Sequence, residues 1–256
     1  MEEISNSLSA LDIQGVFQPI NFSNMSRFLV IAASSSIGQK LVDQLKSAGH
    51  EVVTTARDSA KISPDFILDA TDFAATEEVF RKVGEIDGVA NLSGSLLLKG
   101  AHMTSQDEYK SVIEASLSTA FSVSRAAAKT MKKGGSVVLI SSAAAMTGLA
   151  NHEAIAAAKA GIIGLAKSAA ATYASQNLRF NVVAPGLTET NLTKQITANE
   201  MARKVSESMH ALGRIGNAEE IAQAIAFFLD QKNSWITGQV LAVDGGLSNV
   251  RPKAKA

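Results

Sequence analysis

The chain has 256 residues, 46% of them hydrophobic, with 24 basic and 24 acidic side chains and no net charge. Such a chain buries a large core, commonly in one domain, and its neutrality favours a small-molecule substrate over nucleic acid or an anionic membrane. The absence of cysteine excludes disulfides, thiolate metal sites and a cysteine nucleophile, and we expect no metal centre.

Residues 1–26 precede the first expected strand and are predicted to be an added N-terminal extension. They start with acidic residues and contain no uninterrupted apolar core, so they match neither a secretory signal nor an arginine-rich transit peptide. Further along, no apolar run is expected to reach the roughly 20 residues that a bilayer requires. The alanine-rich region near its middle is interrupted by charge, at His152, Glu153, Lys159 and Lys167. We therefore expect a soluble cytoplasmic protein without membrane contact.

From Arg27 onward, short apolar runs alternate with longer helical patterns. Strands are expected at 27–33, 50–56, 65–70, 86–93, 135–142, 179–186 and 239–246, and helices at 37–49, 76–83, 106–131 and 152–174. The segment between the second and third strands contains Pro64 and is too short for a helix. This alternation predicts a single α/β Rossmann-like domain over 27–248, a doubly wound parallel sheet of about seven strands with helices on both faces. Residues 249–256 are expected to form a solvated tail.

The turn after the first strand, Ala32 to Gly38, reads AASSSIG. In a sheet of this kind the first strand-to-helix turn receives a pyrophosphate at the helix N-terminus, usually on a glycine-rich loop. Here only Gly38 remains, while Ser34, Ser35 and Ser36 offer hydroxyl and backbone N–H groups. An anion site and a purely structural turn both fit this segment.

The end of the second strand reads TTARD, with Ala56 followed by Arg57. An acidic residue there would bind the 2′-hydroxyl of a ribose, whereas a basic one accommodates a 2′-phosphate. The sequence therefore favours NADP(H) over NAD(H), with Arg57 as the cause. An ordinary surface arginine beside Asp58 is the alternative.

Several segments resemble the short-chain dehydrogenase/reductase family over roughly Arg27 to Gly246. The C-terminal half carries the most specific ones, APGLTET at 184–190 and LGRIGNAEEIAQAIAFFLDQKNSWITGQVLAVDGG at 212–246. NLSG at 91–94 is similar to the family's Asn-Asn-Ala-Gly, and DATD at 69–72 to the segment that faces the adenine. The resemblance implies a homotetramer and the following cofactor contacts: Ala32, Ser34, Ser35, Ser36, Ile37, Arg57, Asp69, Ala70, Asn91, Ser93, Gly94, Lys159, Pro185, Gly186, Thr188 and Thr190.

The family's catalytic set is Asn, Ser, Tyr and Lys, the last two spaced Tyr-x-x-x-Lys. Ser142 and Lys159 match it, but Ser116 occupies the asparagine position and Ile155 the tyrosine position. Isoleucine has no proton to donate, so the usual carbonyl reduction cannot use that position. Tyr173 and Tyr109 are too distant to replace it, and we interpret both as packing or interface residues.

His152 precedes Lys159 by seven residues, which places both within about 20° of the same helix face. A related branch, the enoyl-[acyl-carrier-protein] reductases, has Tyr-x6-Lys at this spacing with an apolar residue at the usual tyrosine position. Ser36-Ile37 is similar to the cofactor loop of that branch, whereas Ser142 is similar to the ketoreductases. His152 is therefore a candidate proton donor, expected to act as the neutral imidazole. The alternative is a histidine at a helix start that Asn151 caps.

Three hypotheses follow. The first is an NADPH-dependent reductase of a C=C or C=O bond, in which Lys159 fixes the nicotinamide ribose and His152 or Ser142 polarises the oxygen. The second is a pseudoenzyme that binds a dinucleotide or a partner subunit without turnover, and the third is a binder of another ligand. The substrate is not specified by the sequence: residues 192–214 predict only an apolar-lined lid.

Overall fold

The computed structural model describes residues 25–252. The predicted N-terminal extension therefore lies outside the described residues except for Met25 and Ser26, and so do residues 253–256 of the predicted tail. Every pair of neighbouring strands in the main sheet is parallel.

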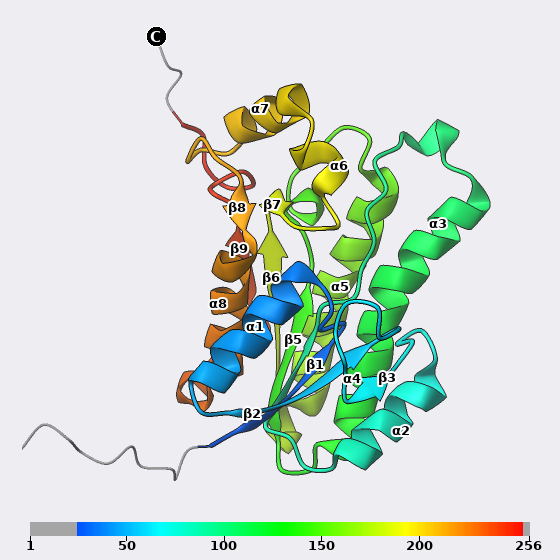
Figure 1. The fold of residues 1–256 in the computed structure, drawn as a ribbon. Helices are drawn as coiled ribbons and strands as arrows, with labels where there is room; N and C mark the ends of the chain where they lie inside the picture. The colour runs from blue at the N-terminus through cyan, green and yellow to red at the C-terminus, as the bar shows by residue number, and fades with distance from the viewer. Residues whose placement is uncertain (1–24, 253–256) are drawn as a thin grey trace, which may run out of the picture.

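Seven strands form this sheet in the order β3-β2-β1-β4-β5-β6-β9 (Figure 1). They are β1 (Arg27–Ile31), β2 (Glu51–Ala56), β3 (Phe66–Ile67), β4 (Gly88–Asn91), β5 (Gly135–Ile140), β6 (Leu178–Pro185) and β9 (Val240–Val243). Two further strands, β7 (Thr188–Glu189) and β8 (Gly216–Asn217), pair separately. The order reverses between β1 and β4, as in dinucleotide-binding folds, and the predicted fold class is confirmed.

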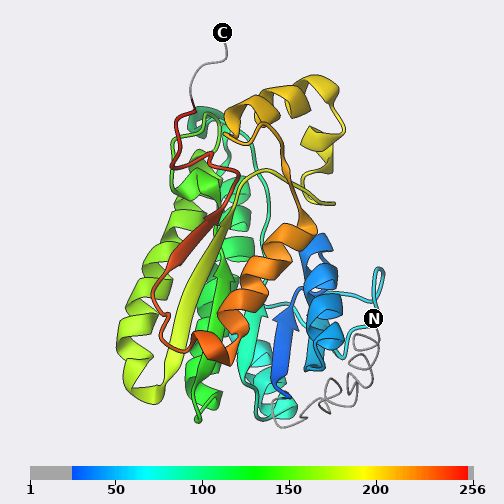
Figure 2. The ribbon, with the colours of Figure 1, turned by 90° about the vertical axis from the view of Figure 1, so that its left-hand side faces the viewer.

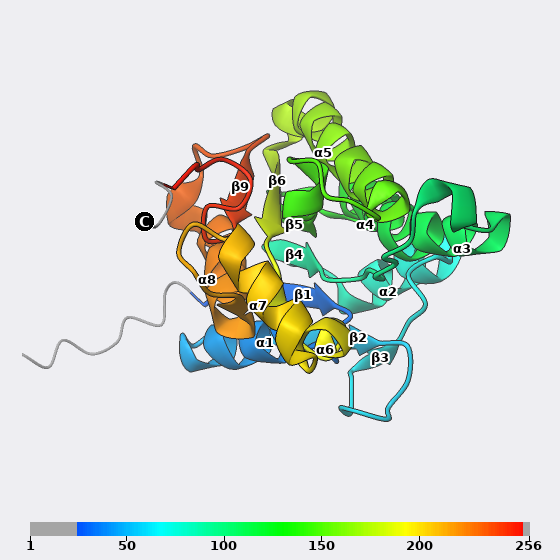
Figure 3. The same cartoon turned by 90° about the horizontal axis from the view of Figure 1, so that it is seen from above.

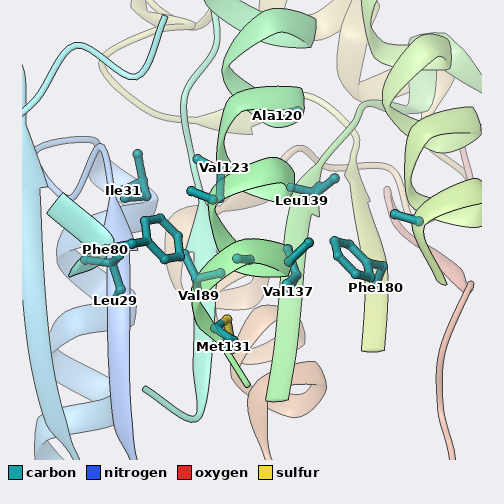
Figure 4. Packing of buried hydrophobic residues seen from close by; sticks show 14 of the residues in the cluster. Leu29, Ile31, Phe80, Val89, Ala120, Val123, Met131, Val137, Leu139 and Phe180 are labelled. Carbon is teal, nitrogen blue, oxygen red and sulfur yellow. The ribbon is translucent and has the colours of Figure 1, made fainter. Parts of the chain in front are cut away.

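Helices cover both faces of the sheet, as Figure 3 shows from above. The helix α1 (Ser36–Ser47) packs beside α8 (Ala218–Leu229) on one face, and α2 (Phe73–Val83), α4 (Thr119–Thr130) and α5 (Glu153–Tyr173) lie on the other. Successive strand residues point to opposite faces. Leu29 and Ile31 therefore join the core beneath α2 and α4, shown in Figure 4, while Phe28 and Val30 pack beneath α1 and α8.

Beyond the carboxyl ends of the strands lie two short helices, α6 (Lys194–Thr197) and α7 (Glu200–Met209), at the top of Figures 1 and 2. They belong to the segment expected to form a lid. The chain returns from them through β8 into α8, which begins with a capping box made by Asn217 and Glu220.

Two expected elements differ from the structure. The strand predicted at 65–70 contains only β3, because the Asp65 carboxylate binds the Thr54 amide (2.8 Å) and hydroxyl (2.7 Å) and takes the place of a ladder bond. The helix predicted at 106–131 is interrupted: α3 (Gln106–Ile113) passes into a π-helical turn at Glu114–Ser118 before α4. There the Thr119 hydroxyl bonds the carbonyls of Ala115 (3.1 Å) and Ser116 (3.0 Å).

The segment Glu153–Gln176, which includes α5, has a mean hydropathy of 1.3 in its most apolar window. By length and composition it could cross a membrane, so the expectation that charge makes this region too polar is wrong. In the fold, α5 packs against α4 and β6, and its buried side chains include Ala158, Ile162 and Ala166. Its apolar character is thus explained by a position in the core.

Candidate functional site

The turn between β1 and α1 keeps a glycine-like backbone without glycine. Ala32 has a φ of 59°, in the left-handed region that costs an L residue about 1–2 kcal/mol. The Ser35 side chain caps α1 by accepting from the Gly38 amide at 3.1 Å, and the first turn of α1 contains no acidic residue. A Cβ on Gly38 would lie 2.8 Å from the backbone of Ala33, so only glycine fits there. The first turn of α1 therefore contains no carboxylate that would repel an anion.

Ser36 joins this turn to Asn191, the residue before the lid. Its hydroxyl accepts a hydrogen bond of 3.1 Å from the Asn191 amide, and its own proton remains available to an acceptor at the helix N-terminus. The neighbouring half-buried side chain of Ile37 packs against the core, while Ser34 is also half-buried. Of the three serines, Ser36 thus has a clear link to a second segment.

Arg57 follows the last residue of β2 and is exposed at the carboxyl end of the sheet. Asp58 accepts from the Ala60 amide (2.9 Å) within its own loop. The pKa of Asp69 is lowered mainly by its hydrogen bonds from Thr71 and to a smaller extent by the charge of Arg57. The structure therefore brings Arg57 and Asp69 near each other, with Ala70 buried beside them.

Lys159 is the centre of a buried polar cluster. Its Nζ donates to the Ile140 carbonyl at 2.9 Å, and a Cβ on Gly94 would lie 3.0 Å from Nζ and 3.8 Å from the Ser116 hydroxyl. Ser116 is fully buried, and its hydroxyl has no hydrogen-bond partner among the described residues. Ser116 lies in the π-helical turn, and its hydroxyl is close to Gly94 and Lys159.

Burial lowers the pKa of Lys159 to about 8. No carboxylate of the described residues forms an ion pair with Lys159. The ammonium has three N–H donors, of which the Ile140 carbonyl uses one. The cluster can therefore bind a polar group from a ligand, through the remaining Lys159 donors and the unpartnered Ser116 hydroxyl.

Ile155, at the position of the missing tyrosine, is only 3% exposed. It forms a small apolar cluster with Val112, Ala154 and Ala158, against which Leu97 and Ile113 pack. The substitution therefore leaves no polar group beside Lys159 at this position. As expected, the tyrosines lie elsewhere: Tyr173 packs on Phe180 with ring centroids 5.9 Å apart, and Tyr109 is exposed on α3.

His152 is the N-cap residue of α5 and is partly exposed, without a side-chain cap bond. Its Nδ1 lies 2.7 Å from the Ala150 carbonyl, and a carbonyl only accepts, so Nδ1 carries the proton. This bond uses the Nδ1 proton, and the role of His152 as a proton donor stays a prediction. The alternative that Asn151 caps the helix is wrong: Asn151 has a φ of 62° and its carbonyl accepts from Lys99.

Ser142 follows β5, and its hydroxyl accepts from the Ala144 amide at 3.1 Å. Among the hydrogen bonds of residues 25–252, none joins Ser142, His152 and Lys159 to one another. Instead, the hydroxyl of the adjacent Ser141 donates a hydrogen bond of 2.8 Å to the Lys159 carbonyl in α5. The three predicted catalytic side chains are therefore not preassembled by direct bonds.

The remaining candidates lie at the carboxyl ends of β4 and β6. The Asn91 side chain donates to Thr119 (3.5 Å) and accepts from the Ser93 amide (3.1 Å). Pro185 ends β6, and Gly186 leads on to a buried Thr188; the Thr190 amide donates to the Thr193 hydroxyl at 3.1 Å. Sequence reasoning missed two residues. One is Thr119, whose hydroxyl bonds carbonyls of the π-helical turn. The other is His210, which was placed only in the lid region.

Comparison with known proteins gives a consistent result. The family model described as enoyl-(acyl carrier protein) reductase matches residues 31–248. The 3-oxoacyl-[acyl-carrier-protein] reductase FabG of Salmonella typhimurium is 35% identical over 239 residues, covering 86% of this chain and 96% of the relative. The FabG of Thermotoga maritima is 36% identical, and the match covers 73% of this chain and 77% of the relative.

Solved structures agree with these relatives. The aldohexose dehydrogenase of Thermoplasma acidophilum, in ligand-free form, superposes with a TM-score of 0.82 at 28% identity, covering 91% of this chain and 97% of that one. A tyrosine-to-phenylalanine variant of ElxO with NADPH bound superposes with a TM-score of 0.80 at 26% identity. This match covers 87% of this chain and 98% of that one.

Proposed function

The chain belongs to the short-chain dehydrogenase/reductase family and is an NAD(P)-dependent oxidoreductase, and we propose that it uses NADPH to reduce a C=O or C=C bond of a small apolar substrate. The observation that carries this proposal is the Lys159 cluster. A buried lysine with free donors, an unpartnered Ser116 hydroxyl and an exposed Gly94 lie together at the carboxyl end of the sheet.

The residues around the cluster fit a dinucleotide, since the Ala32 turn has the required left-handed backbone and the first turn of α1 contains no carboxylate that would repel an anion. The turn 32–37 would hold the pyrophosphate, Asp69 and Ala70 the adenine, Asn91, Ser93 and Gly94 the ribose side, and Pro185 to Thr190 the nicotinamide. When bound, NADPH supplies a hydride to the substrate carbon. Arg57 would bind the 2′-phosphate and so confer the preference over NADH.

The chain's own residues then have separate tasks. Lys159 holds the nicotinamide ribose through donors that Ile140 does not use, and Ser142 orients the substrate oxygen. His152 supplies the proton from its imidazole, whose Nδ1 lies 2.7 Å from the Ala150 carbonyl. This atypical arrangement replaces the tyrosine that Ile155 has displaced.

An apolar substrate is supported by the Ile155 cluster and by the lid. Leu97 and Ile113 border that cluster, and the exposed apolar side chains of the lid include Leu192 and Met201. The FabG relatives reduce 3-oxoacyl groups by name, so acyl chains are the first substrates to test. Steroid-like and quinone-like compounds are the next two classes.

We propose a cytoplasmic homotetramer. One interface would use α3 and α4, where Tyr109 is 47% and Phe121 49% exposed, and the other the segment 235–246. In that segment Trp235 is 99% exposed, with Phe227 and Leu241 also partly exposed nearby in the fold. Such apolar side chains favour burial between copies. Light scattering at micromolar concentration that returned a monomer would contradict this assembly.

The deciding experiment is a titration of purified full-length protein with NADPH and NADH, followed by NADPH oxidation assays on 3-oxoacyl thioesters, ketones and enones. Binding with turnover supports the proposal. Binding without turnover on all three substrate classes would contradict the proposed reduction and favour the pseudoenzyme alternative. A failure to bind either dinucleotide would contradict the cofactor assignment itself.

A further inference from the structure

His210 connects three segments at the carboxyl end of the sheet. It is the C-cap residue of α7, in the lid, and is only 4% exposed. Its ring Nδ1 lies 2.6 Å from the Ser206 carbonyl within α7, and its Nε2 accepts from the Leu187 amide at 3.2 Å. One imidazole thus joins the end of the lid helix to the segment that follows β6.

These two partners determine the protonation of the ring. The Ser206 carbonyl only accepts, so Nδ1 carries a proton, and the Leu187 amide only donates, so Nε2 carries a lone pair. The buried ring is therefore neutral with both nitrogens satisfied. The nearby Asp244 carboxylate accepts instead from the amides of Gly246 and Ser248, both at 2.9 Å, so it does not form a charged pair with His210.

The backbone around the ring fits closely. A Cβ on Gly186 would lie 2.7 Å from Nε2 of His210 and 2.9 Å from Cα of Asp244, so a side chain at residue 186 would displace the ring. On the other side of the ring, a Cβ on Gly245 would lie 3.5 Å from the Cβ of His210. The Leu212 amide donates to the Gly245 carbonyl at 3.0 Å. The ring therefore lies between the segments after β6 and β9.

We propose that His210 is a positioning residue for the reaction: through its bond to the Leu187 amide it fixes the backbone of residues 185–190 relative to the lid. This inference rests on the proposed function in one respect, namely that residues 185–190 contact the dinucleotide. The fixed backbone prepares that segment for the ligand before it binds, which lowers the ordering cost of binding. Opening of α7 would break the Leu187 bond and release the same segment.

Three variants separate the two bonds of the ring. His210→Gln places an amide oxygen near the position of Nε2 and keeps an acceptor for Leu187. His210→Asn places an amide nitrogen near the position of Nδ1 and keeps only the donor to Ser206. His210→Phe keeps the ring volume and removes both bonds. Circular dichroism and thermal melting establish that each variant is folded.

The first measurement is amide hydrogen exchange at Leu187 in cofactor-free protein, with the Ser141 amide, which bonds the Val183 carbonyl at 2.8 Å, as an internal control outside residues 185–190. We expect slow exchange at Leu187 in the unsubstituted protein and in His210→Gln, and exchange at least ~5-fold faster in His210→Asn and His210→Phe, within the range of one neutral hydrogen bond. Fast exchange at Leu187 in the unsubstituted protein would overturn the proposal, whether or not the variants fold.

The second measurement is the Kd for NADPH. We expect His210→Asn to weaken binding about 5- to 10-fold, and His210→Gln to restore it to within about 2-fold of the original. Equal Kd values for the Gln and Asn variants would contradict a positioning role. Should the unsubstituted protein bind no dinucleotide, the cofactor assignment fails, and the exchange measurement still decides whether His210 fixes Leu187.

Discussion

The amide of Asn191 donates a hydrogen bond of 3.1 Å to the hydroxyl of Ser36, 155 positions earlier in the chain. The bond links the start of α1, where a pyrophosphate would bind, to the residue that precedes the lid. Because the hydroxyl accepts from Asn191, its own proton is free to point to a phosphate oxygen. A serine thus takes a position where the family has glycine and adds a link that glycine cannot make.

Ser36→Ala removes this hydroxyl without changing the helix start. We expect the variant to bind NADPH about 10- to 100-fold more weakly, the effect of about 1.5–3 kcal/mol for a hydrogen bond to a charged group. Isothermal titration measures the affinity, with Ser34→Ala as the matched control that should change it less. An affinity for NADPH within 2-fold of the original would show that the Ser36 hydroxyl does not contact phosphate.

Ala32→Gly tests the strain of the same turn. Ala32 has a φ of 59°, so glycine should relieve about 1 kcal/mol and raise Tm by about 2–4 °C for a chain of this size. Ala33→Gly is the control. Ala33 is buried and lacks a positive φ, so removal of its methyl group should lower Tm. A Tm for Ala32→Gly equal to or below the original would contradict the strain argument.

The sequence predicted the order and type of elements well, because parallel strands buried on both faces form short uninterrupted apolar runs such as Val137 to Leu139. It failed where side chains compete with the backbone for hydrogen bonds. The Asp65 carboxylate shortened β3, and the Thr119 hydroxyl accompanies the π-helical turn in what was predicted to be one helix. Such side-chain bonds to the backbone leave no trace in apolar periodicity.

Arg57→Ala addresses cofactor choice. The guanidinium is exposed at the end of β2, where it can reach a 2′-phosphate that NADH lacks. We expect NADPH binding to weaken by about 1.5–3 kcal/mol and NADH binding to stay nearly unchanged. Lys61→Ala, which removes another exposed cation from the same loop, should affect neither. Equal losses for both dinucleotides would refute the role of Arg57.

Lys159→Met tests the buried ammonium through pH. Burial lowers the pKa of Lys159 from 10.5 to about 8, so between these values the unfolded chain binds more protons than the folded one. The free energy of unfolding should therefore rise as pH increases from about 8 to 10.5, by about 3 kcal/mol at 1.36 kcal/mol per pKa unit. Below pH 8 the full penalty for the buried charge is present.

The Met variant should accordingly be more stable than the original at pH 7, and the rise above pH 8 should be smaller. Urea denaturation at a series of pH values measures both effects, with Lys167→Met, exposed on the same helix, as the control. An unchanged rise in Lys159→Met would mean that another group titrates in this window. The same variant should bind NADPH more weakly, because Lys159 is proposed to hold the ribose.

For the candidate site, the resemblance to the family pointed to Lys159, Ser142 and the position of the absent tyrosine. It could not reveal that the Ser116 hydroxyl lacks a partner, since that depends on the π-helical turn, nor that the His152 ring bonds the Ala150 carbonyl. His210 was missed for the same reason: its two partners, Ser206 and Leu187, come from different segments that only the fold brings together.

The missing tyrosine leads to the last prediction. If His152 is the proton donor, His152→Ala should lower kcat by about 10²- to 10⁴-fold with little change in NADPH affinity. His102→Ala, which removes another exposed imidazole, is the control.

Ile155→Tyr provides an independent test, since a phenol in the buried cluster of Val112 and Ala158 would crowd the pocket and lower native turnover. A gain of ketone reduction in Ile155→Tyr, together with unaltered activity in His152→Ala, would remove histidine from the mechanism and leave Ser142, an ordered water or the substrate as the proton source.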